Sequence, residues 1–362
     1  MKPKVVLGLS GGVDSALCAR LLMEDYAVIA LYLSIGPDSA GEEDARRVAG
    51  ELGIPFHVMD ISRALEEHVK TPFAADYLSG RTPLPCARCN PLVKFPALLA
   101  LAEAEGADHI ATGHYARTGR GKDGRTFLLK GLPANDQSYM LARLPQEILQ
   151  MVIFPLGDYD KSMVRERAEA LGLPVAHKPD SMEICFIPDD DYGKWLEARG
   201  QGCPPGDFIA PDGALLGRHK GIHRYTLGQG RGLGVSGPHR YYVSDIDPES
   251  NTVTLSDGSD LFREEVFCVE PNWISVSGLE GPMEVTARFR HARTETACTI
   301  SPVEGGVLVK AHTPVRAPTP GQLAVFYDGD MVVGSGWIGR LKFSGECRRA
   351  GLEPAPTKVG NA

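Results

Sequence analysis

Val5-Val6-Leu7-Gly8-Leu9-Ser10-Gly11-Gly12-Val13-Asp14-Ser15 is the stretch that decides the fold of this chain. The apolar, β-branched run 5–9 predicts a buried strand. Two glycines then permit a tight turn, and Asp14 or Ser15 is expected to cap a helix over 16–23. A strand, a glycine turn and a helix N-terminus together present converging N–H groups to an anion. The stretch therefore predicts a site for the phosphates of a nucleotide.

This stretch differs from two common nucleotide-binding loops. The lysine of G-x-x-x-x-G-K-[ST] is missing, and G-x-G-x-x-G does not occur in it. The order S-G-G-x-D-S is instead similar to the loop of enzymes that split ATP between its α- and β-phosphates. A purely structural glycine turn is the alternative interpretation.

Length and composition are those of an ordinary globular protein. The chain has 362 residues, 43% of them hydrophobic and 23% charged, which is enough for two or three domains with real cores. No apolar run is long enough to span a membrane, and the first strand is broken by glycines, so neither a membrane partner nor a signal peptide is expected. Eight cysteines without framework spacing favour the reducing cytoplasm. The net charge of −8 neither indicates nor excludes a nucleic-acid partner, because local charge decides that.

Strand and helix patterns alternate through the first half of the chain. Strands are expected at 28–33, 56–59 and 109–112, and helices at 42–52, 92–105 and 161–171, the last capped by Asp160. This order predicts an α/β fold with a doubly wound parallel sheet, whose ligands bind beyond the carboxyl ends of the strands. Leu33 and Gly113 are expected at that edge, beside the glycine turn.

The composition changes after Trp195. Glycine- and proline-rich loops come first, and short alternating strands follow at 241–243, 252–255, 283–290, 307–309 and 324–327, which favours a small barrel or sandwich. We therefore expect a catalytic domain over 1–196, a small central domain over 197–268, a β-barrel-like domain over 269–352 and a flexible tail over 353–362.

Three cysteines have positions that suit chemistry. Cys86 and Cys89 follow Thr82-Pro83-Leu84-Pro85, whose prolines predict an extended loop ahead of the next helix. The helix dipole and Arg88 are expected to lower the pKa of these thiols. Cys185 stands alone, far along the chain. Packing in the core is the alternative, and it suits Cys18; a structural zinc site would need a second C-x-x-C, which does not occur.

A series of motifs, in order over nearly the whole chain, resembles the tRNA-specific 2-thiouridylases of the PP-loop ATP pyrophosphatase superfamily. The motifs are Ser10 to Ser15, Gly80-Arg81-Thr82-Pro83, Cys89-Asn90 with Lys94-Phe95, Ala111-Thr112-Gly113-His114-Tyr115, Asp136-Gln137-Ser138-Tyr139, Asp180-Ser181 with Ile184-Cys185-Phe186-Ile187, Tyr225-Thr226-Leu227-Gly228-Gln229 and Thr319-Pro320-Gly321-Gln322. A PP-loop domain, a small central domain and a C-terminal β-barrel are the fold that this resemblance implies.

The resemblance also implies a reaction. ATP, with Mg²⁺, adenylates the C2 oxygen of the wobble uridine and releases pyrophosphate; sulfur then replaces the activated oxygen, giving 2-thiouridine and AMP. The implied ATP-binding residues are Gly8, Leu9, Ser10, Gly11, Gly12, Val13, Asp14, Ser15, Leu33 and Gly113. Cys185 is implied to carry sulfur as a persulfide, received from a sulfur-donor protein such as a cysteine desulfurase or a relay, and Cys89 to act as the nucleophile.

A tRNA with a modifiable wobble uridine is the implied substrate. The family positions that contact tRNA match His114, Asn135, Asp136, Gln137, Arg288, Phe289 and Gln322. Basic residues cluster over 218–231 and 288–293, which agrees with contacts to phosphate, and Phe289 could stack on a base. A solvated charged face is the alternative for these clusters.

The chain departs from the family pattern around its first cysteines. Cys86 stands where an aspartate is usual, Leu84 replaces an asparagine, and Pro91 and Asn135 replace lysines; the segment after Leu33 is also short. A third thiol makes Cys86, Cys89 and Cys185 candidate ligands of a [4Fe–4S] cluster that would carry the sulfur, an alternative to the persulfide route in which Cys86 is an auxiliary thiol. An amide-forming PP-loop ligase and a non-catalytic tRNA-binding or redox module are the rival functions.

Overall fold

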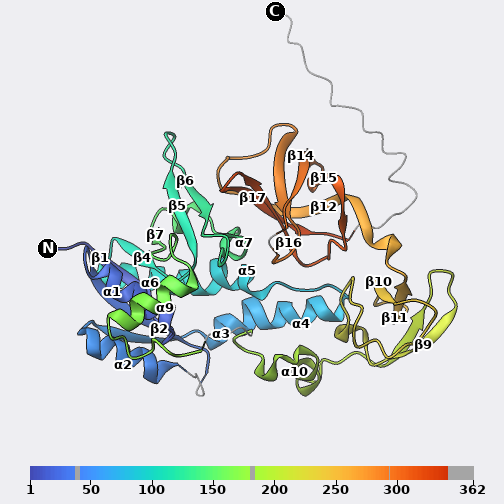
Figure 1. The fold of residues 1–362 in the computed structure, drawn as a ribbon, viewed down its shortest axis with the longest axis horizontal. Helices are drawn as coiled ribbons and strands as arrows, with labels where there is room; N and C mark the ends of the chain where they lie inside the picture. The colour runs from blue at the N-terminus through green and yellow to red at the C-terminus, as the bar shows by residue number, and fades with distance from the viewer. Residues whose placement is uncertain (37–40, 180–183, 293, 341–362) are drawn as a thin grey trace, which may run out of the picture.

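The computed structural model describes residues 1–36, 41–179, 184–292 and 294–340, which form three sheets with their helices (Figure 1). Three predictions lie outside these residues: the Asp180-Ser181 motif, the end of the expected third domain and the tail over 353–362. Among the helices that are described, none is both long and apolar enough to cross a membrane.

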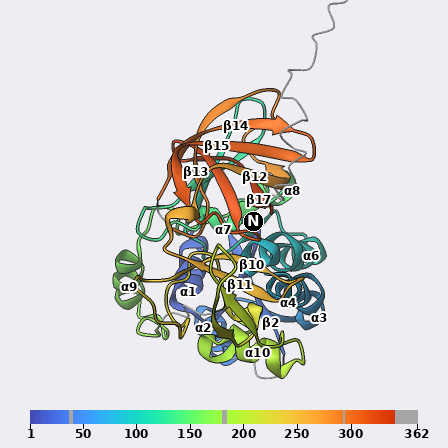
Figure 2. The same cartoon turned by 90° about the vertical axis from the view of Figure 1, so that its right-hand side faces the viewer.

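The first sheet is parallel throughout and confirms the predicted doubly wound fold. Its strand order is β3 (Phe56–Asp60), β2 (Ala27–Ser34), β1 (Lys4–Gly8), β4 (His109–Ala111) and β7 (Val152–Ile153). Side chains of β1 alternate between two cores: Val6 packs on the side of α6 (Phe95–Glu105), and Val5 and Leu7 pack on the side of α1 (Val13–Leu22) and α2 (Glu42–Leu52). Figure 2 shows α1 and α9 (Lys161–Ala170) on one side and α6 on the other.

Helix ends in this domain follow local chemistry. Helix α9 begins as predicted, since Asp160 accepts a hydrogen bond from the N–H of Met163 at 2.9 Å. Helix α6 ends at Gly106, which takes the left-handed conformation (φ 61°). The predicted cap of α1 was wrong. That helix begins at Val13 with Gly12 at the N-cap, so Asp14 and Ser15 lie inside its first turn.

Short helices connect the first sheet to the rest of the chain. They are α3 (Ser62–Leu65), a π-helical turn (Glu66–Lys70), α4 (Thr71–Leu78), α5 (Pro85–Cys89), a second π-helical turn (Asn90–Lys94), α7 (Ser138–Leu141), α8 (Gln146–Leu149), a 3₁₀ turn (Pro188–Asp190) and α10 (Tyr192–Ala198). The predicted helix at 92–105 is therefore a π-helical turn that continues into α6.

A small four-stranded sheet forms the central unit. Its order is β10 (Tyr242–Asp247), β11 (Thr252–Ser256), β8 (Gly206–Ile209) and β9 (Leu215–His219), with 3₁₀ turns at Ile222–Arg224 and Ser259–Leu261. Its core is built by Phe208, Val243, Val253 and Leu255, which are all buried.

A closed six-stranded barrel follows and confirms the predicted C-terminal β-barrel. Its order is β12 (Phe262–Trp273), β15 (Gly306–Arg316), β14 (Thr296–Val303), β13 (Met283–Arg288), β16 (Leu323–Asp328) and β17 (Met331–Ile338), and the pairing of β12 with β17 closes it. Strand β12 begins at Phe262, so the boundary expected between residues 268 and 269 falls inside a strand.

The barrel sheet is extended by a hairpin of the first domain that was not predicted from the sequence. Strand β5 (Ala116–Arg120) pairs with β6 (Thr126–Lys130), and Leu129 of β6 pairs with Met331 of β17. In Figure 1 the hairpin stands beside the barrel. Tyr139 and Leu323, from the two domains, lie in one hydrophobic cluster, and the Tyr139 hydroxyl donates to the Leu323 carbonyl at 2.9 Å.

Candidate active site

The glycine turn, called here the phosphate loop (residues 8–15), follows β1 at the carboxyl edge of the parallel sheet. Gly11 has a φ of +74°, and a Cβ there would lie 2.4 Å from the carbonyl oxygen of Gly41, so only glycine fits. Gly113, just after β4, also lies close to the loop, although less tightly: a Cβ on it would lie 3.2 Å from the Ser15 nitrogen. The structure thus brings Gly113 against the loop, as predicted from the strand order.

Ser15 holds the turn together from inside the helix. Its hydroxyl oxygen accepts from the N–H of Ser10 at 3.1 Å and donates to the carbonyl of Gly12 at 3.0 Å. Ser15 is buried, so these bonds are shielded from water. The loop is therefore a preformed turn at the N-terminus of α1.

Two lysines from distant segments reach the phosphate loop. The ammonium of Lys161, at the start of α9, lies 2.8 Å from both carboxylate oxygens of Asp14, and the Tyr115 hydroxyl donates to the same carboxylate at 2.6 Å. The ammonium of Lys178 donates to the Gly11 carbonyl at 3.1 Å and to Asp44 at 2.6 Å. The hydrogen bond from Lys178 is the main reason why the pKa of Asp44 lies below its ordinary value.

These lysines were missed from the sequence. Neither stands within the loop motif, and only the folded chain brings α9 and the segment before residue 180 to α1. They supply the positive charge that the loop itself lacks. The carboxylate of Asp14, one of the implied ATP-binding residues, is neutralised by Lys161 in this structure.

The two clustered cysteines lie on a helix and not in the extended loop that was predicted. The extended chain ends at Leu84 (φ −118°, ψ 84°), and α5 begins at Pro85. Proline is well suited to the first position of a helix, because its missing N–H has no partner there anyway. Helix α5 then continues into the π-helical turn 90–94, whose Asn90 amide donates to the Met140 carbonyl at 3.0 Å.

The third cysteine comes close to the first two, although it is far from them in the sequence. Cys89 packs against the same hydrophobic cluster as Ile184, Phe186 and Ile187, the neighbours of Cys185. Cys86 and Cys185 are exposed, and Cys89 is partly buried. Each of Cys86 and Cys185 disfavours ionisation of Cys89, so the three thiols share one neighbourhood.

The prediction that the thiol pKa is lowered was wrong for Cys89. Burial is the largest effect and raises the pKa of Cys89 to about 11, while the ammonium of Lys94 pulls it down only in part. The pKa of Cys185 is raised as well, by burial and then by Cys86. Arg88 acts elsewhere, because its guanidinium carbon lies 4.9 Å from the ring centroid of Trp337 on β17.

The three thiols do not form a ligand set for a metal cluster as the chain is folded here. Within the ranges that the structure describes, no three side chains of histidine, cysteine, aspartate or glutamate are arranged to hold a metal ion. The residues therefore do not fit a [4Fe–4S] cluster in this arrangement.

His114 lies between the phosphate loop and the cysteines. Its Nδ1 is 2.8 Å from the Thr112 hydroxyl, and its Nε2 is 3.5 Å from the ammonium of Lys94. Burial, followed by the charge of Lys94, holds the pKa of His114 well below its ordinary value. The ring is therefore neutral at physiological pH.

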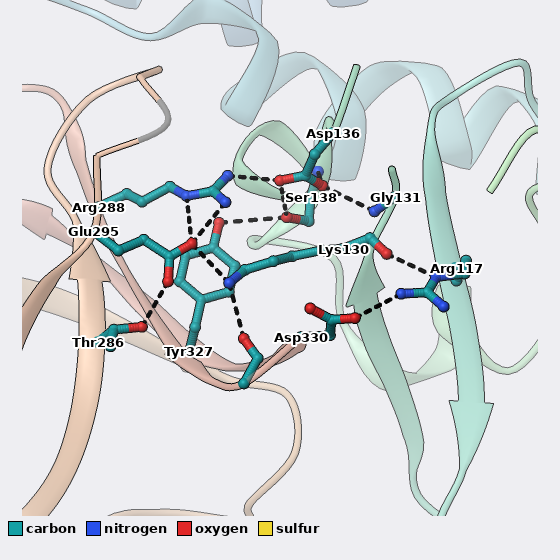
Figure 3. Close-up of polar contacts among 11 residues, drawn as sticks. Arg117, Lys130, Gly131, Asp136, Ser138, Thr286, Arg288, Glu295, Tyr327 and Asp330 are labelled. Carbon is teal, nitrogen blue, oxygen red and sulfur yellow. Dashed lines mark hydrogen bonds and ion pairs between the residues drawn. The ribbon is translucent and has the colours of Figure 1, made fainter. Parts of the chain in front are cut away.

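Asp136 and Arg288, both predicted to contact tRNA, face each other in a network between the first domain and the barrel (Figure 3). Their charged groups are 2.6 Å apart, and their side chains are only 4% and 10% exposed. Arg288 also pairs with Glu295 at 2.7 Å, and Lys130 pairs with Glu295 at 2.6 Å. The Tyr327 ring lies 4.8 Å from the Arg288 guanidinium carbon.

The other predicted tRNA contacts are also engaged within the protein. Phe289 is buried in the barrel core, and the Gln322 amide donates to the carbonyls of Thr82 and Pro83 at 3.0 and 3.1 Å. The side-chain oxygen of Asn135 accepts from the Lys161 N–H at 3.1 Å, and that of Gln137 accepts from the Tyr115 N–H at 3.0 Å. Within the protein, Gln322 links the barrel to the segment before α5, and Asn135 and Gln137 hold residues near the loop, while the contact of all these residues with tRNA stays a prediction.

Two arginines of the basic cluster in the central unit are paired with carboxylates, whereas Lys220 and Arg231 are exposed. Arg218 pairs with Asp207 at 2.9 Å, and Arg224 pairs with Glu197 at 2.6 Å. His219 and His223 are buried. At Arg218, His219, His223 and Arg224, therefore, the cluster over 218–231 does not present unpaired positive charge to the solvent.

The comparisons with known proteins agree with this architecture. The family model described as tRNA methyl transferase HUP domain matches residues 3–189, tRNA methyl transferase PRC-barrel domain matches 194–257, and aminomethyltransferase beta-barrel domain matches 263–338. The class of protein is thus a HUP-domain chain that carries two barrel modules.

Curated relatives narrow the class. The tRNA-specific 2-thiouridylase MnmA of Acetivibrio thermocellus is 44% identical over 93% of this chain and 99% of its own length. That of Heliobacterium modesticaldum is 44% identical over 99% of this chain and 98% of its own, and MnmA 2 of Caldanaerobacter subterraneus subsp. tengcongensis is 45% identical over 93% and 98%. This chain belongs to the tRNA-specific 2-thiouridylase family.

Proposed function

We propose that this chain is a tRNA-uridine 2-sulfurtransferase that converts the wobble uridine to 2-thiouridine. The observation that carries the proposal is that Cys89 packs against the segment of Cys185, on a chain whose phosphate loop is already folded. A ligase that makes amides has no use for such a pair of thiols. Membership in the 2-thiouridylase family supports the same reaction.

The first step is adenylation. The uridine C2 oxygen attacks the α-phosphorus of ATP, the bond to the β-phosphate oxygen breaks, and pyrophosphate leaves. The phosphate loop and the N-terminus of α1 would hold the phosphates, together with Lys161 and Lys178 once these exchange their present carboxylate partners for the nucleotide. Mg²⁺ would offset phosphate charge, and Asp14 is the loop carboxylate that would face it. Leu33 and Gly113 would line the adenosine.

The second step moves sulfur. A persulfide on Cys185, formed by a sulfur-donor protein, attacks C2, and AMP leaves with the former uridine oxygen. Cys89 then attacks the Cys185 sulfur, the S–S bond of the adduct breaks, and its electron pair forms the thiocarbonyl. The products are 2-thiouridine and a Cys89–Cys185 disulfide, which a cellular dithiol reduces by two electrons. His114, Asn135, Asp136, Gln137, Arg288, Phe289 and Gln322 remain the proposed tRNA contacts, and the cytoplasm the proposed location.

The experiment that tests the proposal supplies the purified chain with tRNA, ATP, Mg²⁺ and a persulfide donor. Nucleoside mass spectrometry measures 2-thiouridine, and a separate assay measures pyrophosphate. We expect Cys89→Ser and Cys185→Ser to abolish 2-thiouridine and to retain tRNA-dependent pyrophosphate release. Cys203→Ser, in the central unit, is the matched control.

Each alternative function gives a different result in these assays. Pyrophosphate release without any 2-thiouridine from the wild type, kept in full by both cysteine variants, would indicate an amide-type ligase. No tRNA-dependent pyrophosphate from the wild type would indicate a binding module. Iron and sulfide bound after anaerobic purification, with activity dependent on them and on Cys86, would favour the cluster route over the persulfide route.

A further inference from the structure

Two arginines of the first domain share one tryptophan of the barrel beside the cysteine helix. Arg88 lies on α5 between the two cysteines, and its guanidinium carbon is 4.9 Å from the centroid of the Trp337 ring. Arg143, shortly after α7, places its guanidinium carbon 5.5 Å from the same ring. Trp337 itself is buried (8% exposed), so the ring is a fixed support for both cations.

A carboxylate acts on each of these two cations, Asp76 on Arg88 and Glu270 on Arg143, but within the described ranges neither pair is close enough to form a salt bridge. Within the described ranges, Arg143 donates to the backbone carbonyl of Glu270, and no hydrogen bond of the Arg88 guanidinium is found. The arginines that stack on Phe56 and Trp195 differ, because Arg46 pairs with Glu42 and Arg199 pairs with Glu66. Stacking alone leaves the N–H edges of a guanidinium available to a ligand.

The pair is costly without a ligand. Burial and the nearby charge of Arg88 both lower the pKa of Arg143, although the carboxylate of Glu270 opposes them. An anion between the two guanidiniums would relieve the repulsion and satisfy their donors in the bidentate geometry that arginine forms with phosphate. A neutral base would do neither.

We propose that Arg88, Arg143 and Trp337 form a binding site for a backbone phosphate of tRNA, next to the uridine that is modified. The inference rests on the proposed function, because it takes tRNA as the polyanion that reaches α5. The position of Arg88 explains why the phosphate would lie near the uridine that is modified. Arg88 is adjacent in the chain to Cys89, so a phosphate bound here would fix the tRNA backbone beside the cysteines that transfer sulfur. The phosphates of ATP are assigned to the phosphate loop and not to this site.

The experiment measures the affinity for tRNA of Arg88→Gln and Arg143→Gln over a series of salt concentrations. Each lost phosphate contact should reduce the slope of log K against log salt by about 0.7 to 0.9, and should weaken binding at low salt about fivefold to tenfold. Arg88→Lys keeps the charge, so its slope should stay at the wild-type value. Arg46→Gln, which removes another stacked arginine on α2, is the matched control and should change neither quantity. The affinity for ATP should be unchanged in all four variants.

A wild-type slope in both glutamine variants would overturn the inference, even if thiolation fell. A merely structural role predicts that outcome, with a lower melting temperature and unchanged salt dependence. If Arg88→Gln fails to fold, Arg143→Gln and Arg88→Lys still decide the question. Failure of the proposed function is distinguishable, since the wild type would then bind no tRNA or make no 2-thiouridine.

Discussion

The ionisation of Cys89 decides when sulfur chemistry can start in this chain. With a pKa of about 11, only about one Cys89 in a thousand is a thiolate at pH 8, whereas a free cysteine with a pKa of about 8.5 is about one quarter ionised. Because the thiolate is the reactive form, Cys89 should react with iodoacetamide about two orders of magnitude more slowly than a free thiol. The rate should rise about tenfold per pH unit up to pH 10. Replacing Lys94 by Met removes the one charge that favours the thiolate, so the reaction should become slower still.

Alkylation of Cys89, followed by peptide mass spectrometry between pH 7 and pH 10.5, measures this directly in the wild type and in Lys94→Met. Lys70→Met, which removes another lysine of the same domain with no part in the Cys89 shift, controls for general charge effects. An inflection below pH 9 in the wild type, or faster alkylation in Lys94→Met, would refute the reasoning. The expected result implies that substrate binding must itself activate Cys89.

Three further predictions follow from single contacts. Gly11→Ala should lower the melting temperature and abolish ATP binding, because its Cβ would lie 2.4 Å from a carbonyl oxygen. The control Gly12→Ala should fold normally, because its Cβ would meet only the Ser10 hydroxyl at 3.6 Å. Equal melting temperatures of the two variants would contradict the prediction. Arg288→Met should cost about 3–5 kcal/mol of unfolding free energy in a urea titration, because it leaves Asp136 buried without its cation, and a loss below 1 kcal/mol would count against the network. The pKa of His114 is lowered in the folded chain, so as the pH falls below about 6.5 the unfolded chain binds a proton at this residue before the folded chain does. The folded state should therefore lose stability below that pH. His114→Gln should reduce this loss, which melting temperatures measured over a pH series would show.

The sequence patterns were sufficient to predict the parallel sheet and the C-terminal barrel. Strand β1, the glycine turn and α9 with its Asp160 cap each have a local signal, either an apolar run, a glycine pair or a capping residue. The prediction of the α1 cap failed because Gly12 ends the turn two positions before Asp14 and three before Ser15. The sequence did not predict the hairpin β5–β6, because residues 116–130 contain few apolar side chains. The strand that pairs with its β6 is β17, which is far away in the chain.

The site was predictable only where chemistry and local sequence coincide. Cysteine and glycine have few structural uses in such contexts, so Cys89, Cys185 and Gly11 could be recognised. Lys161 and Lys178 carry no such signal, because a lysine on a helix or in a loop is usually solvated. The pKa of Cys89 was misjudged for a physical reason: the dipole and Arg88 were counted, but the burial that the fold imposes on the thiol was not.

The hairpin that joins the two domains has a consequence for how this protein can be dissected. By sequence β6 belongs to the first domain, but its outer edge is covered by β17, and its Lys130 N–H donates to the Asp330 carbonyl at 2.9 Å. A fragment that stops before Phe262 would leave that edge bare, and an isolated barrel would lose both its neighbour and the Tyr139 side of its core. Either piece would tend to self-associate. A chimaera that borrows the barrel of a relative should therefore borrow residues 116–130 with it.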